Sequence, residues 1–235
     1  MIIPKSLLKL TAIFALSSLS FACTALRKNN NEQVLAQSSE PKIVYGNLII
    51  NEKSDYVMIP VLAEEETERG FSYPSSGTKS DSYHNFIFYN KSAQQSYLLL
   101  DKYSLITLFE TIGVVEGGKQ SDFKAFLFGI VENDTNGDGK LNRDDAIVAY
   151  LSDISGKKLQ QITPPNTQLV SWQFDKASSK LFVKIRQDSN KDKKFTGEDE
   201  TTFFVVDIKQ TSMGTDIIGS ELQEKLKSIR FKEAK

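Results

Sequence analysis

The stretch KLFVKIRQDSNKDKKFTGEDETTFFVVDI, residues Lys180–Ile208, decides the fold. At its start, Leu181, Val183 and Ile185 alternate with other side chains, mainly cationic ones, and this alternation predicts a half-buried β-strand. Its end, Thr201–Ile208, is rich in β-branched and aromatic residues and predicts a second strand. An acidic segment separates the two. The stretch therefore predicts an antiparallel hairpin whose connection is a polar, acidic loop.

The same pattern occurs earlier in the chain, so the sequence contains an internal repeat. A shift of 54 residues places Leu127 on Leu181 and the acids of residues 134–145 on those of residues 188–199. Self-similarity at a fixed period is typical of folds built from repeated supersecondary units. Each unit is expected to run strand, acidic loop, strand, turn, strand. The two units span about 123–165 and 177–218.

Short alternating runs separated by turn residues continue through residues 42–235. The glutamates between Tyr56 and Leu100 lack the spacing of the repeat and are expected to form a solvated turn. Ser220–Ser228 begins with a helix-starting serine and predicts a short helix. We expect a single, mainly β domain of antiparallel hairpin repeats, like propeller blades or a small sandwich, with a short C-terminal helix. The hairpins are expected at Ile43–Ile50 with Tyr56–Leu62, Asn85–Tyr89 with Ser96–Leu100, and Gln168–Phe174 with Lys180–Ile185.

The sequence YLSDISGKKLQQIT, Tyr150–Thr163, resembles blades of the TolB-type β-propellers. A propeller blade has four antiparallel strands, and a unit of about 50 residues fits one. The resemblance covers about two or three such units. Propellers generally need at least four blades to close, and about 190 residues barely supply them. A smaller open sheet or sandwich is therefore the alternative.

The acidic loop DTNGDGKLNRDD, Asp134–Asp145, resembles the calcium loops of EF-hand and dockerin-like proteins, and Asp188–Asp199 follows the same spacing. Calcium takes six to eight oxygen ligands at roughly 2.3–2.6 Å. Alternate residues of a tight loop turn toward one point, so oxygens at every second position converge there. The resemblance implies backbone carbonyl ligands from the lysines and side-chain ligands, direct or through water, from the other residues. The implied calcium ligands are Asp134, Asn136, Asp138, Lys140, Asn142 and Asp145 in the first loop, and Asp188, Asn190, Asp192, Lys194, Thr196 and Asp199 in the second.

Both loops depart from the loops of EF-hand sensors. Asp145 stands where those proteins carry a longer glutamate. Gly139 permits the sharp reversal of the first loop, but Lys193 takes its place in the second, where a left-handed backbone costs on the order of 1 kcal/mol. Leu141 and Phe195 are expected to anchor the loops on the core. The alternative is a polar turn without metal, because Asp, Asn and Gly are common turn residues.

The flanks of the loops distinguish these units from a true EF-hand, which sets its loop between two helices. Strand-like runs flank the second loop on both sides. Phe126, Ile130 and residues 144–154 could also line helices around the first loop, but the repeat favours strands there. We therefore expect calcium loops within hairpins, and not a helix pair that opens on binding.

Residues 1–22 are expected to form a signal peptide. Lys5 and Lys9 precede an uncharged apolar run, Leu10–Ala22. This run is shorter than the roughly 20 apolar residues that span a bilayer, and its length and position fit a secretory signal.

The end of the apolar run, Leu19–Cys23, resembles a bacterial lipobox. This resemblance implies a lipoprotein in which Cys23 is lipidated and becomes the mature N-terminus. Cleavage after Ala36 by an ordinary signal peptidase is the alternative. Residues 23–41 are polar and aperiodic and are expected to form a flexible tether between the lipid and the domain.

Composition narrows the function classes. The formal net charge is −1, so the chain has no basic field that would attract nucleic acid. Cys23 and His84 are the only residues of their types, which excludes an internal disulfide and argues against zinc sites rich in cysteine or histidine. The sequence has no phosphate-binding glycine loop and no nucleophile elbow. No enzyme activity is predicted.

The sequence thus predicts a calcium-binding, lipid-anchored protein of the bacterial cell envelope, facing the periplasm or the surface, with a structural or binding role. Its expected partners are calcium, the membrane through the N-terminal lipid, and an envelope protein or glycan. A propeller-like scaffold that binds protein or glycan without metal is the first alternative. A hydrolase of envelope polymers, with carboxylates drawn from distant parts of the chain, is the second.

Overall fold

The computed structural model describes residues 42–63, 82–116 and 119–232. Of the two compact units into which the chain divides, Pro41–Lys235 contains all of them. The expectations for the signal peptide, Cys23, Ala36, the tether and the glutamate-rich turn lie outside the described residues. Within the described ranges, no helix has both the length and the apolar character needed to cross a membrane.

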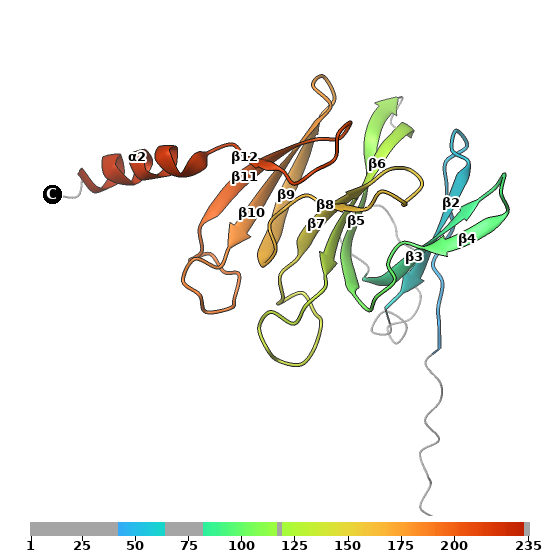
Figure 1. Ribbon diagram of the computed structural model, residues 1–235, viewed down its shortest axis with the longest axis horizontal. Coiled ribbons are helices and arrows are strands. Elements are labelled where there is room, and N and C mark those ends of the chain that lie inside the picture. Colours follow the sequence, from blue (N-terminus) through green and yellow to red (C-terminus); the bar gives the residue numbers. More distant parts are fainter. Residues whose placement is uncertain (1–41, 64–81, 117–118, 233–235) are drawn as a thin grey trace, which may run out of the picture. The chain divides into compact units, whose positions relative to one another are not determined.

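The described strands form three successive layers of four antiparallel strands, followed by a helix (Figure 1). β3 joins β5 through the pair Tyr83 and Ile106, so the first two layers make one sheet. The third layer is a separate sheet with the order β12-β11-β10-β9. The elements are β1 (Ile49–Ile50), β2 (Tyr56–Leu62), β3 (Tyr83–Asn90), β4 (Gln95–Leu98), β5 (Leu105–Glu116), β6 (Lys119–Val131), β7 (Val148–Ser152), β8 (Gln160–Gln161), β9 (Thr167–Asp175), β10 (Lys180–Gln187), β11 (Thr201–Asp207), β12 (Thr215–Asp216) and α2 (Gly219–Lys232).

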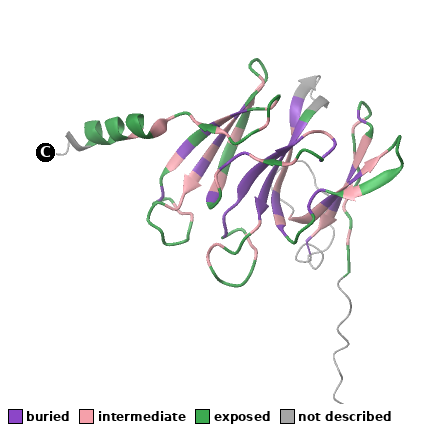
Figure 2. Cartoon of the chain, in the orientation of Figure 1, coloured by how far each residue is buried: buried purple, intermediate pink, exposed green. Residues whose placement is uncertain are grey.

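Two hydrophobic cores lie on opposite faces of the middle layer, because successive side chains of a strand point to opposite faces. Along β6, Phe126 and Phe128 belong to the core shared with the first layer, whereas Leu127 belongs to the core shared with the third. Figure 2 shows β7 and the described part of β6, residues 124–131, as mostly buried. Burial of each large apolar side chain contributes about 1.5–3 kcal/mol. The middle layer is therefore held from both sides.

Backbone hydrogen bonds tie the third layer to the middle one. The amide of Leu169 donates to the carbonyl of Ile147 at 2.8 Å, and the amide of Gly214 donates to the carbonyl of Ile162 at 2.9 Å. A Cβ on Gly214 would lie 3.0 Å from that same carbonyl oxygen, so the close approach favours glycine.

The predicted fold class is confirmed: the chain is mainly β, with two antiparallel sheets and one short C-terminal helix in the described ranges. The predicted strand at Ile43–Ile50 is wrong in length, since β1 covers Ile49–Ile50 and Tyr45 forms an isolated bridge with Val61. Ile43, Tyr45 and Leu48 stay exposed, so little apolar burial holds that segment in a continuous ladder. The helix α2 is longer than the predicted Ser220–Ser228.

Candidate metal centre

Each acidic loop joins the second and third strands of a layer. Residues 134–145 lie between β6 and β7, and residues 188–199 lie between β10 and β11 (Figure 1). The prediction that strands flank both loops is confirmed. The ends of each loop are consequently held by paired strands on a packed sheet, a more rigid frame than a helix pair that changes its angle.

Asp134 holds the first half of the first loop together. Its Oδ1 accepts hydrogen bonds from the amides of Gly137 at 2.6 Å and Asp138 at 3.1 Å, and its Oδ2 accepts one from the amide of Gly139 at 2.7 Å. These bonds, that of Gly139 above all, lower the pKa of Asp134 because they favour the ionised carboxyl group. The first residue of the loop is therefore a carboxylate directed into the bend.

Asn136 and Asp138 continue this bend. The Oδ1 of Asn136 accepts from the amide of Asp138 at 2.9 Å, and the Oδ1 of Asp138 accepts from the amide of Lys140 at 2.9 Å. Both bonds span two residues, which is the Asx-turn geometry. Asn142 directs its Nδ2 at Asp138 Oδ2, 3.2 Å away, so in this arrangement it supports the Asp138 carboxylate. Side-chain oxygens of alternate residues thus accept hydrogen bonds from groups of the same short loop.

Asp145 is the last residue of the first loop, and its side chain bonds to the backbone of that loop. It is fully buried, and its Oδ1 accepts hydrogen bonds from the amides of Thr135 at 2.8 Å and Asn136 at 3.2 Å. Its Oδ2 accepts one from the amide of Asn142 at 3.0 Å. A buried carboxylate requires such compensation. Asp145 therefore ties the two ends of the loop together.

The second loop repeats the bend of the first. Asp188 accepts from the amides of Asp192 at 3.1 Å and Lys193 at 3.0 Å, as Asp134 does in the first loop. Asn190 Oδ1 accepts from the amide of Asp192 at 3.0 Å, and Asp192 Oδ1 accepts from that of Lys194 at 2.9 Å. The weaker sequence match therefore has the same geometry as the stronger one.

Asp199 closes the second loop as Asp145 closes the first. Its Oδ2 accepts from the amide of Thr196 at 2.8 Å, and its Oδ1 accepts from the amide of Ser189 at 3.1 Å. These hydrogen bonds, that of Thr196 first, lower the pKa of Asp199 although burial acts against them. The carboxylate is ionised at neutral pH.

The backbone turns left-handed at the same two places in each loop. The φ angles are 82° at Gly137 and 81° at Gly139 in the first loop, and 62° at Lys191 and 64° at Lys193 in the second. The predicted left-handed backbone at Lys193 is confirmed, and that at Lys191 was not predicted. A left-handed residue with a Cβ costs roughly 1–2 kcal/mol, so the second loop is held in this shape against strain.

Sequence reasoning missed the second residue of each loop. The hydroxyl of Thr135 lies 3.3 Å from Asp145 Oδ1 and accepts a hydrogen bond from the amide of Ala146 at 2.9 Å. Ser189 makes the equivalent contacts with Asp199 at 3.3 Å and with the amide of Glu200 at 3.1 Å. The internal repeat could have revealed these residues, because the second position of each loop holds a small residue with a hydroxyl group.

The oxygen-only donor set suits a hard cation such as calcium. Each loop has carboxylates at its first and fifth positions, an amide oxygen at the third, and a backbone carbonyl at the seventh. In the described part of the chain, no three acidic, histidine or cysteine side chains gather around one point. The third acid of each set, Asp145 or Asp199, is buried and accepts hydrogen bonds from loop amides. The groups of each loop that could hold a cation are two carboxylates and neutral oxygens.

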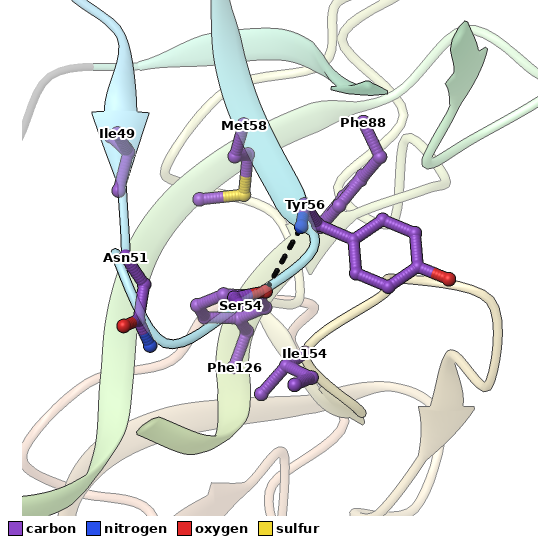
Figure 3. A pocket seen from close by; sticks show the side chains of 8 residues that line it. All are labelled: Ile49, Asn51, Ser54, Tyr56, Met58, Phe88, Phe126 and Ile154. Atoms are coloured by element: carbon purple, nitrogen blue, oxygen red, sulfur yellow. Dashed lines mark hydrogen bonds between the residues drawn. The ribbon is translucent and has the colours of Figure 1, made fainter. Parts of the chain in front are cut away.

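An apolar hollow beside β2 offers no comparable chemistry (Figure 3). It has room for about one water molecule, far below the size of a ligand pocket. The hydroxyl of Ser54, one of its few polar groups, already accepts the Tyr56 amide at 3.1 Å. The hollow is lined by Ile49, Asn51, Ser54, Tyr56, Met58, Phe88, Phe126 and Ile154.

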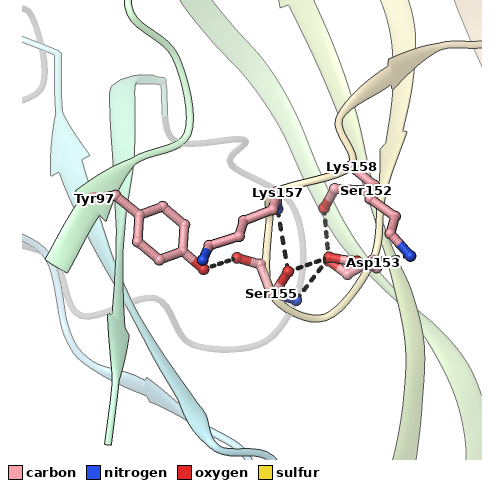
Figure 4. Close-up of polar contacts among 6 residues, drawn as sticks. All are labelled: Tyr97, Ser152, Asp153, Ser155, Lys157 and Lys158. Carbon is pink, nitrogen blue, oxygen red and sulfur yellow. Dashed lines mark hydrogen bonds and ion pairs between the residues drawn. The ribbon is translucent and has the colours of Figure 1, made fainter. Parts of the chain in front are cut away.

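The stretch Tyr150–Thr163 makes a contact between layers (Figure 4). The Tyr97 hydroxyl of β4 donates to the carbonyl of Ser155, and Lys157 Nζ lies 4.8 Å from the centre of the Tyr97 ring. Burial is the main cause that raises the pKa of Tyr97. Asp153 accepts the Ser155 amide at 3.0 Å and so shapes the turn. This turn therefore docks the middle layer onto the first.

His84 is the only histidine of the chain. Its ring packs against Tyr103 with centroids 5.4 Å apart. Its Nδ1 is buried and has no hydrogen-bond partner within the described residues. The absence of enzyme activity stays a prediction.

Comparison with known proteins gives this chain no family. No protein-family model matches it, and no curated protein is significantly similar to it in sequence.

Proposed function

We propose that this chain is a calcium-binding protein of the bacterial cell envelope, anchored by an N-terminal lipid and with a structural or binding role. The two acidic loops support the proposal. They lie 54 residues apart in the sequence and share one bend, one pattern of carboxylate–amide bonds and one pair of left-handed residues. The lipobox-like Leu19–Cys23 supports the envelope location.

The residues of each loop would have different roles in binding the cation. Asp134 and Asp138, with Asp188 and Asp192, would hold the cation by side-chain carboxylates. Asn136 and Asn190 would add amide oxygens, and Lys140 and Lys194 would add carbonyls, while Asn142 and Thr196 would act through water. Asp145 and Asp199 would close each loop behind the ion. Bound calcium would neutralise the carboxylates and cross-link the two strands that each loop joins.

Thermal unfolding of the full chain in calcium and in chelator tests this function. Calcium at about 100 times its Kd should stabilise the folded state by about 2.7 kcal/mol per site. The variant Asp134→Ala/Asp138→Ala/Asp188→Ala/Asp192→Ala should lose the calcium response. Asp175→Ala is the matched control, because Asp175 also accepts a turn amide, that of Ala177 at 3.0 Å, outside either loop. Identical melts of the wild type in calcium and chelator would sink the proposal.

A metal-independent scaffold is the second candidate. The third layer leaves Val170, Phe203 and Ile217 exposed, and exposed apolar side chains on a sheet can contact a protein or a glycan. On this account, the wild type and the loop variants would each have the same stability in calcium as in chelator. The same unfolding experiment therefore separates the two candidates.

A further inference from the structure

The side chain of Lys193, in the second loop, lies close to the first loop. The Nζ of Lys193 lies 3.9 Å from the place that a Cβ on Gly137 would take. Gly137 is also one of the residues whose amide bonds Asp134. The two loops are therefore neighbours, and both leave the layered sheets at the same end (Figure 1).

The backbone does not explain why a lysine occupies this position. Lys193 has a φ of 64°, and its amide donates to Asp188 Oδ2 at 3.0 Å. In the first loop, Gly139 makes the equivalent bond to Asp134 at 2.7 Å without steric cost. Glycine would therefore serve the second loop better. A lysine differs from a glycine at this position because its side chain reaches the first loop.

We propose that Lys193 is a tethered cation that lowers the calcium affinity of the first loop. This inference rests on the proposed function. Without calcium, the Lys193 ammonium group compensates the negative charge around Asp134. A divalent ion in the first loop repels that ammonium group, which must move away into solvent. The second loop thus sets the calcium concentration at which the first loop fills.

The size of the effect follows from the charges. A unit charge and a divalent ion roughly 6 Å apart in water repel each other enough for about a tenfold change in affinity. Salt at about 0.15 M screens part of this repulsion. Removal of the Lys193 charge should therefore tighten calcium binding to the first loop by about three- to tenfold at that ionic strength.

Calcium titration of the full chain, followed by NMR, tests the inference. The amide resonance of Gly139, whose Cβ position has nothing within 4 Å, reports on the first loop. Lys193→Met removes the charge and keeps most of the side chain's length. Lys191→Met is the matched control, because it removes an equal charge from an equally left-handed residue of the same loop. Lys193→Met should tighten first-loop binding about three- to tenfold, and Lys191→Met less than about twofold, with the difference shrinking at 0.5 M salt.

Equal effects of the two variants, or no effect of either, would overturn the role of Lys193 and leave calcium binding intact. A Gly139 resonance that ignores millimolar calcium in every variant would instead refute the proposed function. A zero-length carbodiimide cross-link provides a second measurement. It should join Lys193 to Asp134 or Asp138 in chelator, and saturating calcium should suppress it. A cross-link that calcium leaves unchanged would show a purely structural ion pair and would also overturn the inference.

Discussion

Asp145 is the residue on which the shape of the first loop depends most. Its buried carboxylate accepts three loop amides. The substitution Asp145→Asn replaces one of the two acceptor oxygens with an NH2 group, which would face the backbone N–H groups of the loop. We therefore expect the unfolding free energy to fall by about 2–4 kcal/mol. The loss should appear in chelator, because these bonds need no metal. Urea unfolding measures it.

Asp144→Asn is the control for this prediction, since Asp144 is exposed and adjacent. It should change the unfolding free energy by less than about 0.5 kcal/mol. If the Asp145 and Asp144 variants were equally stable, the loop would be held by something other than the buried carboxylate.

Gly156 should be the least replaceable of the left-handed glycines. Its φ is 77°, and a Cβ there would lie 2.5 Å from the ring of Phe88. Gly156→Ala combines left-handed strain with overpacking and should cost about 2–4 kcal/mol. Gly139→Ala is the matched comparison, with a φ of 81° and nothing within 4 Å of its Cβ. That variant should cost only about 1–2 kcal/mol in chelator, and equal costs in urea unfolding would argue against the Phe88 contact.

At the scale of elements, α2 stands apart from the sheets. Leu222, Leu226 and Ile229 are 47%, 56% and 54% exposed, and Lys227 pairs with Glu200 at 3.1 Å on the surface. A surface ion pair is worth about 0–1 kcal/mol. A chain ending at Ile218 should therefore unfold within about 1 kcal/mol of the full chain in urea. A larger loss would show that the helix packs on the domain.

Strand identity was predictable because alternation survives in each hairpin. β9, β10 and β11 match their predicted ranges within about one or two residues, the ordinary uncertainty of element ends. The segment before β1 was not predictable, since its apolar residues resemble a strand but Tyr45 and Leu48 find no core to enter. The docking of the layers also escaped prediction, because it depends on contacts such as Tyr97 with Ser155 that are distant in sequence.

The candidate loops were predictable to a similar degree. Spacing alone placed Asp134 and Asp188 at the start of each bend, where both accept hydrogen bonds from loop amides. Spacing did not reveal that Asp145 and Asp199 face loop amides, because a ligand and a loop-closing acceptor have the same residue type. Nor did it reveal the reach of Lys193 to the first loop, which depends on how the layers stack.

At the scale of the whole molecule, acid should unfold this protein through its bonded carboxylates. Hydrogen bonds lower the pKa values of Asp134, Asp175 and Asp199. At Asp216, burial acts to raise the pKa, but bonds from Ile218, Thr202 and Gly219 together lower it. Groups with a lowered folded-state pKa stabilise the protein above their unfolded value, about 3.9, and lose that contribution as the pH falls below it.

Urea midpoints measured in chelator between about pH 7 and pH 2.5 check this expectation. Stability should decline as the pH falls below about 5, and Asp216→Asn should make the decline shallower. An Asp216→Asn variant with the wild-type pH dependence would remove Asp216 from the account.

The proposed function requires that two loops of one shape each hold one calcium ion. Native mass spectrometry of the full chain in millimolar calcium measures this stoichiometry. The wild type should carry two ions, and Asp134→Ala/Asp138→Ala and Asp188→Ala/Asp192→Ala should carry one each. A wild-type chain that carries no calcium under these conditions would contradict the account.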